Sequence, residues 1–339
     1  MLKLGLHRTG ALLTRVFATL SIVCCGGWGA LALHFKAPVA DPWRVALWAG
    51  LLALAVLAIV GLWRRSALMP APALAVFPVL LVWWAGLAPS NTRDWAGDVA
   101  RTATAVVEGE TLTLSNVRNF RWTGETSFEP AWETRSYDLG RVAKVDLFAS
   151  HWDGENIAHI LVSFGFSDGQ HLAWSAELRR VAGQPYETVA SLFKLSELIL
   201  IAADERDVIG VRALQRGEDV RLYPLSLTPE MGRKLLVSYA QAANELAARP
   251  RWYNALTNNC TTVIFDLART LAPDAAYDWR VLLPGFFADY AWDHGALDKS
   301  IPFSVWRERA GVSALAKAAD LNDGRAFSAS IRTLAVAAP

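Results

Sequence analysis

The chain has 339 residues, of which 53% are hydrophobic and 19% charged, with 33 basic and 32 acidic side chains. This composition excludes a disordered chain. A formal net charge of +1 excludes a protein that coats nucleic acid, because that function needs a clustered basic face. Residues 1–90 hold seven Lys or Arg and one acid, Asp41. We therefore expect a membrane anchor over residues 1–90, followed by a mildly acidic soluble part.

Three apolar segments in the anchor are each close to the ~20 residues that an α-helix needs to cross a bilayer. They are Ala11–Phe35, Trp43–Trp63 and Ala67–Leu87. A cleaved signal peptide would account for one of them but not for three. The sequence therefore predicts three transmembrane helices, the third of which is interrupted by prolines.

The basic residues of the anchor predict its orientation. Lys3 and Arg8 precede the first segment, and Arg64 and Arg65 separate the second from the third. Because positive charges favour the cytoplasmic side, the amino terminus is expected there. After three crossings, the chain from about Ser90 onward lies outside the cytoplasm; if the third segment does not cross, that part is cytoplasmic.

The first half of the soluble part reads as strands. Short runs of β-forming residues separated by turn residues occur at Thr111–Leu114, Ser136–Leu139 and Val142–Phe148. The clearest signal is a hairpin of Ile157–Phe166 and His171–Leu178, with Asp168-Gly169 in the turn. Further strands are expected at Ser196–Ala203, Val208–Leu214 and Val220–Leu225.

The pattern then becomes helical. Thr228, followed by Pro229, predicts a helix start, and this helix ends before Pro250. Asn258 or Asn259 caps a second helix, whose first turn contains Cys260. Aromatic and apolar residues fill Pro284–Trp292, and a short helix is expected at Ser313–Leu321 with Ser313 as its cap.

Cys260 is the only cysteine of the soluble part, since Cys24 and Cys25 lie in the first apolar segment. A free cysteine is often only a small buried hydrophobe. In the first turn of a helix, however, unpaired N–H groups and the helix dipole favour the thiolate, which is the nucleophilic form. The same N–H groups can receive the oxyanion of a tetrahedral intermediate.

A thiol nucleophile needs a base, and His159 is the leading candidate. It interrupts an apolar strand, whereas His151, His171 and His294 lie in loop-like contexts. The alternative is a structural histidine that is satisfied by a backbone carbonyl. A third residue that orients the imidazole is expected on a neighbouring strand. Glu177 is the first candidate, although a two-residue turn would place Leu178 opposite His159, so a bulge or an odd-numbered loop is required.

Several blocks between about Ala100 and Leu271 resemble the Lnb N-terminal periplasmic domain family. The blocks are Ile157-Ala158-His159-Ile160, Ser163-Phe164-Gly165-Phe166, Asp168-Gly169, Ser175-Ala176-Glu177-Leu178-Arg179, Asp204-Glu205-Arg206-Asp207 and Tyr253-Asn254-Ala255-Leu256-Thr257-Asn258-Asn259-Cys260-Thr261-Thr262. The resemblance implies an α+β fold in which a permuted papain-like domain, an antiparallel sheet with packed helices, follows the membrane helices. It also implies Cys260 as nucleophile and His159 as base. Asn259, Thr261, Arg179, Glu205 and Arg206 match polar positions that serve the substrate, the oxyanion or the structure.

The expected domains are the anchor at 1–90, a thiol-enzyme domain at 91–275 and a helical extension at 276–339. The resemblance implies transfer of an acyl chain from phospholipid to an amine acceptor such as a lipoprotein. Two alternatives remain: a cysteine amidase or peptidase acting on the cell wall, and a non-catalytic membrane-anchored binding module. The family carries membrane helices after this domain, whereas here they precede it, a difference that bears on the acceptor.

No cofactor is expected. No Cys/His spacing indicates zinc, and no glycine-rich loop indicates a nucleotide. The acidic run Asp204-Glu205-Arg206-Asp207 is interpreted as an ion-pair cluster at a strand end rather than as a cation site.

Overall fold

The computed structural model describes residues 2–185, 187 and 189–333. The chain divides into two compact units. One consists of residues 1–89 with Phe193–Leu195, and the other of residues 90–192 and 196–339.

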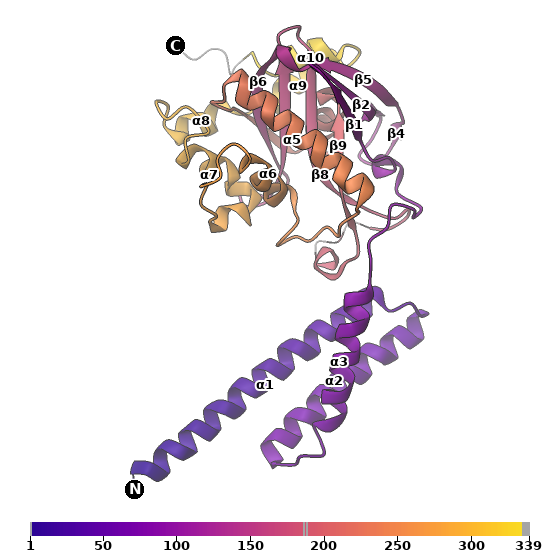
Figure 1. Ribbon diagram of the computed structural model, residues 1–339, viewed down its shortest axis with the longest axis vertical. Helices are drawn as coiled ribbons and strands as arrows, with labels where there is room; N and C mark the ends of the chain where they lie inside the picture. The colour runs from indigo at the N-terminus through magenta and orange to yellow at the C-terminus, as the bar shows by residue number, and fades with distance from the viewer. Residues whose placement is uncertain (1, 186, 188, 334–339) are drawn as a thin grey trace. The chain divides into compact units, whose positions relative to one another are not determined.

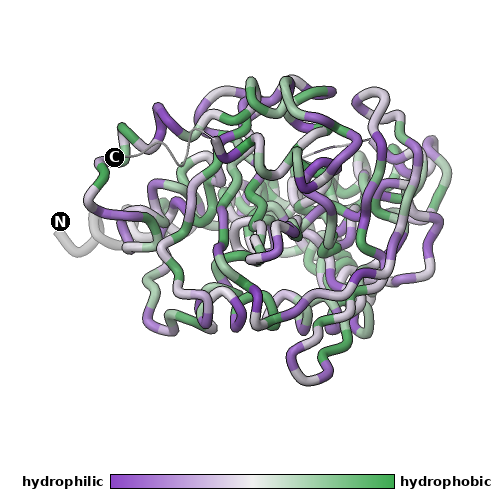
Figure 2. Tube along the Cα trace, turned by 90° about the horizontal axis from the view of Figure 1, so that it is seen from above, coloured by the Kyte–Doolittle hydropathy of each residue, from purple (hydrophilic) through white to green (hydrophobic). Residues whose placement is uncertain are grey.

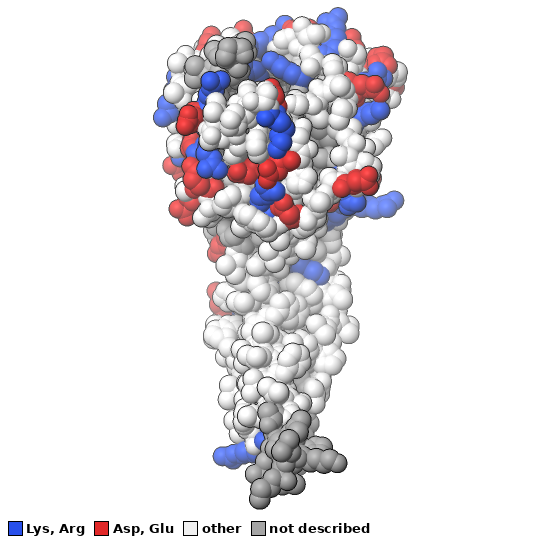
Figure 3. Space-filling model, turned by 90° about the vertical axis from the view of Figure 1, so that its left-hand side faces the viewer, with Lys and Arg blue, Asp and Glu red and all other residues white. Residues whose placement is uncertain are grey.

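The first unit is built from three helices, α1 (Leu2–Lys36), α2 (Asp41–Arg64) and α3 (Ala71–Gly86). Among the described residues, two helical segments are long and apolar enough to span a membrane, Gly10–Lys36 and Asp41–Arg64. The predicted count of three is therefore wrong by this criterion. Pro70 is the N-cap of α3 and Pro72 lies in its first turn; the helix has 16 residues and so rises only about 24 Å at ~1.5 Å per residue. In Figure 3 this unit shows a long surface with few charges.

The second unit is built around a sheet in the order β1-β2-β9-β8-β7-β6-β10, with β5 also paired to β2. The pairs are antiparallel except for a single parallel pair between β2 and β9. The strands are β1 (Thr104–Glu108), β2 (Thr111–Arg118), β5 (Trp132–Asp138), β6 (Val142–His151), β7 (Ala158–Phe166), β8 (His171–Arg179), β9 (Glu197–Ala203) and β10 (Asp219–Pro224). A separate two-stranded ribbon pairs β3 (Arg121–Trp122) with β4 (Phe128–Glu129).

Helices cover both faces of this sheet (Figure 1). One face carries α5 (Pro229–Ala248), α6 (Cys260–Ala268) and α7 (Phe287–Asp293), and the other carries α4 (Glu205–Gly210), α9 (Ser313–Ala318) and α10 (Gly324–Ser330). The remaining helix is α8 (Phe303–Arg309), and the short 3-10 helices are η1 (Gly97–Val99), η2 (Leu139–Arg141), η3 (Ala190–Phe193), η5 (Trp279–Val281) and η6 (Pro284–Phe286). The predicted α+β class, with an antiparallel sheet and packed helices, is confirmed.

Alternate residues of β7 serve the two faces. Ile160, Val162 and Phe164 belong to the apolar core beneath α5 and α6, whereas Leu161 belongs to the core on the other face. Figure 2 shows hydrophobic and hydrophilic residues interspersed along the chain. Successive side chains of a strand point to opposite faces of the sheet, so a strand that is buried on both faces contributes alternate residues to two cores.

The hairpin of β7 and β8 has the odd-numbered loop that Glu177 requires. The Phe166 N–H donates to the Gln170 carbonyl oxygen at 2.9 Å, and the Gly169 N–H donates to the Phe166 carbonyl oxygen at 3.0 Å. Three residues therefore form the loop, and Gly169 takes φ +83°, a left-handed conformation that favours glycine. The resulting register pairs Leu161 with Ser175 and, continued by two residues, sets His159 opposite Glu177.

Two local predictions fail. Residues 208–214 are not a strand: α4 continues into a π-helical turn, η4 (Val211–Gln215). The Asp204 side chain caps this helix by accepting from the Arg206 N–H at 3.1 Å. Ser313 does not cap α9, because its hydroxyl accepts from the Val220 N–H and donates to the Glu218 carbonyl oxygen, both at 2.9 Å.

The acidic run after β9 forms ion pairs, as interpreted from the sequence. Glu205 pairs with Arg332 at 2.5 Å, and Asp207 pairs with Arg118 at 2.9 Å. Both carboxylates are fully buried. Since Arg332 lies near the end of the chain, residues predicted as a separate extension contribute to the core of this unit.

Candidate functional site

The site begins at the capped start of α6. The Asn259 side chain accepts from the Thr262 N–H at 2.8 Å, and the Thr262 hydroxyl accepts from the Asn259 N–H at 2.8 Å. This reciprocal capping box fixes the first turn. Asn254 folds the preceding loop by accepting from the Leu256 and Thr257 N–H groups. Cys260 is thereby placed at the first helical position, as the sequence predicts.

The Cys260 side chain lies where β7 and β8 separate. Ladder pairing between these strands stops at Leu161 and Ser175, although both strands continue. The backbone of Ile160, just beyond the last pair, hydrogen-bonds to Cys260. The Cys260 sulfur at the start of α6 thus takes the place, beside the Ile160 backbone, that a β8 carbonyl oxygen would occupy if the pairing of β7 with β8 continued.

His159 contacts both the thiol and a carboxylate. Its Nε2 lies 2.6 Å from the Ser175 hydroxyl oxygen and 3.4 Å from Glu177 Oε1. The imidazole also lies close enough to the Cys260 side chain for each group to shift the pKa of the other.

Glu177 is held by three side chains. Its Oε1 accepts from the Ser175 hydroxyl at 2.6 Å and from Arg212 Nη2 at 2.8 Å, in addition to its contact with His159. Arg212 comes from the π-helical turn after α4 and donates through Nη1 to the Val208 carbonyl oxygen at 2.8 Å. Helix and sheet together therefore fix the carboxylate behind the imidazole.

The charges of the site reinforce one another. Burial alone lowers the pKa of His159, but Glu177 and Cys260 outweigh it and raise that pKa to about 9. Burial raises the pKa of the Cys260 thiol, yet His159 and the Ile160 backbone bring it below its ordinary value. His159 and Arg212 hold the pKa of Glu177 well below its usual range despite burial. These directions favour a thiolate–imidazolium pair near neutral pH.

The first two amides of α6 complete the arrangement. A helix has no internal acceptor for its first N–H groups. Within the described part of the chain, no hydrogen bond from the Cys260 or Thr261 amide is found. These groups are placed to receive an oxyanion that forms beside the sulfur.

Asn259 and Thr261 use their side chains structurally. Besides its capping bond, the Asn259 side chain donates to the Ala255 carbonyl oxygen at 2.7 Å. The Thr261 hydroxyl donates to the Val281 carbonyl oxygen at 2.6 Å and is fully buried. Both tie the first turn of α6 to adjacent loops, which leaves only backbone amides for an oxyanion.

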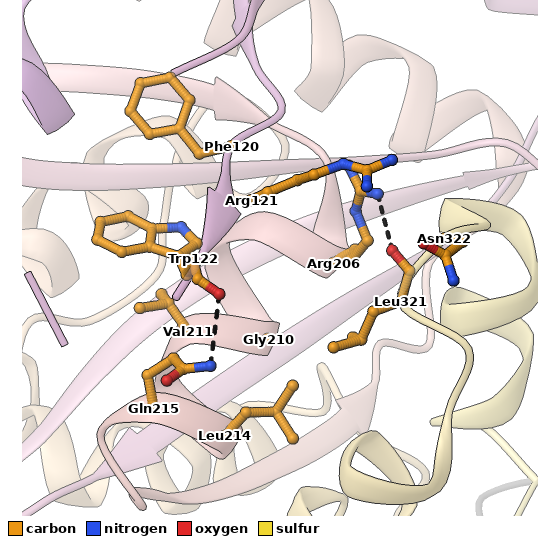
Figure 4. Close-up of a pocket in the computed structure, with 10 residues that line it drawn as sticks. All are labelled: Phe120, Arg121, Trp122, Arg206, Gly210, Val211, Leu214, Gln215, Leu321 and Asn322. Atoms are coloured by element: carbon orange, nitrogen blue, oxygen red, sulfur yellow. Dashed lines mark hydrogen bonds between the residues drawn. The ribbon is translucent and has the colours of Figure 1, made fainter. Parts of the chain in front are cut away.

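Three other predicted polar residues lie away from the thiol. Arg179 donates to Asn91, Val99 and Ala100, and Glu205 belongs to the ion pair with Arg332. Arg206 lines a small cavity on the α4 face, where its guanidinium donates to the Leu321 carbonyl oxygen at 2.8 Å (Figure 4). The structure therefore joins Cys260, His159 and Glu177 but not these three residues.

Two members of the site were not singled out from the sequence. Ser175 lies two residues before Glu177 on the same face of β8, so strand periodicity could have indicated it. Arg212 could not be found in this way, because its segment reads as a strand. Among the described residues, no group of three or more His, Cys, Asp or Glu is placed to hold a metal ion.

A thiol, an imidazole and a carboxylate in this order are also the side chains that thiol acyl-transfer centres use. Residues 128–285 match the family described as the Lnb N-terminal periplasmic domain. The resemblance noted in the sequence is thus confirmed over this segment, which contains all three side chains. No curated protein and no solved structure matches the chain. The family and the two apolar helices fit a membrane-anchored protein with a periplasmic domain.

Proposed function

We propose that this protein is a membrane-anchored periplasmic thiol acyltransferase with Cys260 as nucleophile. The observation that carries the proposal is the array of Cys260, His159 and Glu177 at the start of α6. His159 Nε2 lies 3.4 Å from Glu177 Oε1, and His159 and Cys260 are close enough to shift each other's pKa. Such an array performs acyl transfer through a thioester. We place the helical anchor in the bacterial inner membrane with the amino terminus in the cytoplasm.

In the first half-reaction, the Cys260 thiolate attacks the ester carbonyl of a phospholipid acyl chain. The carbon–sulfur bond forms, and the amides of Cys260 and Thr261 stabilise the oxyanion. The carbon–oxygen bond then breaks, and the His159 imidazolium gives its proton to the departing alkoxide. The products are an acyl thioester and a lysophospholipid.

In the second half-reaction, an amine attacks the thioester. His159, now neutral, takes a proton from the amine as the carbon–nitrogen bond forms. The carbon–sulfur bond breaks and the thiolate returns, paired with the imidazolium. Phospholipid is the donor that a membrane anchor brings closest, and the amino terminus of a lipoprotein is an amine at the same surface.

Mass spectrometry of the purified full-length protein tests this proposal. A variant in which Cys24 and Cys25 are replaced by Ser keeps Cys260 as its sole thiol. After incubation with phospholipid, we expect an added acyl mass on the peptide that contains Cys260, and its release when an amine-bearing lipopeptide is supplied. The Cys260→Ala chain is the matched control.

The alternatives give different results. Cleavage of cell-wall muropeptides without any acyl adduct would indicate the amidase or peptidase. If neither an acyl adduct nor muropeptide cleavage is found, and the protein unfolds at the same temperature as its Cys260→Ala variant, the results would favour the non-catalytic binding module.

A further inference from the structure

The second unit contains an apolar cavity of about 300 Å³ between β6, β7, α5, α6 and α7. Its wall includes Leu147, Val162, Leu235, Ile264 and Ala291. Among the residues that the structure describes, no Asp, Glu, Lys or Arg lines this cavity, and Ser226 and His294 are among its few polar residues. Small-molecule sites commonly have volumes of ~300–1,000 Å³ and predominantly apolar walls.

Two elements lead from the Cys260 thiol to this cavity. On α6, Ile264 follows Cys260 by four residues, so the two side chains lie on the same face one turn apart. On β7, the backbone of Ile160 contacts Cys260, and Val162 is the next residue on that face of the strand. The wall of the cavity therefore begins at Ile264, about one helical turn from Cys260.

The lining indicates the class of ligand. A peptide or a phosphate-bearing group would bring charges and backbone polar groups that these walls do not pair. A hydrocarbon chain needs no such partners and is stabilised by leaving water. Met231, whose unbranched side chain adapts to its neighbours, lies at the cavity together with the rings of Phe287 and Tyr290.

We propose that this cavity binds the unbranched acyl chain of the group that Cys260 carries. The proposal rests on the acyl transfer proposed above and adds where the chain lies and what selects its length. The carbonyl carbon remains at the sulfur and the amides of α6, while the chain extends along Ile264 and Val162 into the cavity.

Filling the cavity tests this assignment. Ala268 and Ala275 line it, so Ala268→Phe and, as a second variant, Ala275→Phe place a ring inside. Ala248→Phe adds the same group at an exposed position of α5 and is the matched control. The substrates are nitrophenyl esters of 4-carbon and 12-carbon acids, presented to the full-length protein in lipid nanodiscs.

We expect Cys260 of the parent chain to be acylated faster by the 12-carbon ester than by the 4-carbon ester. Both filling variants should lower the ratio of the 12-carbon rate to the 4-carbon rate by tenfold or more, and Ala248→Phe should behave as the parent. An unchanged preference in both filling variants would overturn the assignment and leave acyl transfer standing.

A binding measurement separates the cavity from the chemistry. Lauric acid should raise the unfolding temperature of the Cys260→Ala chain, and this shift should vanish when Ala268→Phe is added; butyric acid should give none. A lauric acid shift that survives the filling substitution contradicts the assignment. Absence of acylation by either ester, with the lauric acid shift intact, instead contradicts the proposed function.

Discussion

Glu177 links the candidate nucleophile to the opposite face of the sheet. It contacts His159 and Ser175 on one side and Arg212 on the other. Sequence reasoning and the family resemblance named Cys260, His159 and Glu177, because their chemistry is local to a cap, an apolar strand and a hairpin. Ser175 and Arg212 depend on which groups approach the carboxylate in three dimensions.

Replacing Glu177 with Gln should slow acylation of Cys260 by roughly 10²-fold, the scale of one positioned acid–base partner. The amide keeps the shape of the side chain but removes the charge that raises the pKa of His159. Single-turnover acylation by an activated ester measures the rate. Glu245→Gln, a change at an exposed ion pair, is the control, and an equal loss there would speak against a specific effect of Glu177.

Arg212→Met should lower the free energy of unfolding by roughly 1–3 kcal/mol, since it removes one of the two cations that face the partly buried Glu177 carboxylate. Adding Glu177→Gln should restore part of that stability but not activity. Denaturant titration of both variants tests the coupling. Additive losses in the double variant would show that the pair is not energetically linked.

Among the helices and strands, those that begin at a cap or follow a tight turn could be predicted from the sequence. The Asp168-Gly169 hairpin, the helix that starts after Thr228 and the helix that starts at Cys260 all follow their local signals. Residues 208–214 do not, because an apolar run of this length suits either a strand or a buried helix. The helix α4 is stabilised by the buried ion pairs of Asp207 with Arg118 and of Glu205 with Arg332, which join residues far apart in the sequence.

The cap of α6 should contribute measurably to stability. Asn259→Ala removes the acceptor for the Thr262 N–H and should cost about 1 kcal/mol. Asn259→Asp keeps that acceptor and should retain most of the stability. Urea titration distinguishes them, and equal destabilisation by both changes would mean that the donor bond to Ala255, rather than the cap, matters most.

At the scale of the whole molecule, buried ion pairs hold the second unit together and make it sensitive to acid. Arg332 and the other partners of Glu205 lower the pKa of that carboxyl to about 2 despite burial. In the unfolded chain a glutamate titrates near 4.3. The contribution of Glu205 to the free energy of unfolding is therefore complete above about pH 4.3 and is lost as the pH falls toward 2.

This single group should contribute on the order of 3 kcal/mol. Urea titrations between pH 6 and pH 2 should show stability falling more steeply in the parent than in Glu205→Gln, which has no such proton to bind. Parallel curves for the two proteins would exclude the effect.

Membrane topology depends on the third helix. With the amino terminus in the cytoplasm, a periplasmic domain requires an odd number of crossings, so α3 must cross despite its 16 residues, a mismatch that local bilayer thinning can accommodate. In a chain without native cysteines, Lys317→Cys should react with a membrane-impermeant maleimide in intact bacteria, whereas Ser66→Cys should not. No reaction at either position would show that α3 does not cross and that the domain is cytoplasmic.

The pH dependence of alkylation at Cys260 tests whether His159 holds this residue as a thiolate. In a chain where it is the sole thiol, we expect iodoacetamide to react at neutral pH faster than with free cysteine, with a change in rate near pH 9 as His159 loses its proton. In His159→Gln, the reaction should be slow at neutral pH and rise only above the ordinary thiol pKa of ~8.5, because burial and the Glu177 charge, which raise the pKa of the Cys260 thiol, then outweigh the Ile160 backbone. Identical profiles for the two proteins would contradict the account.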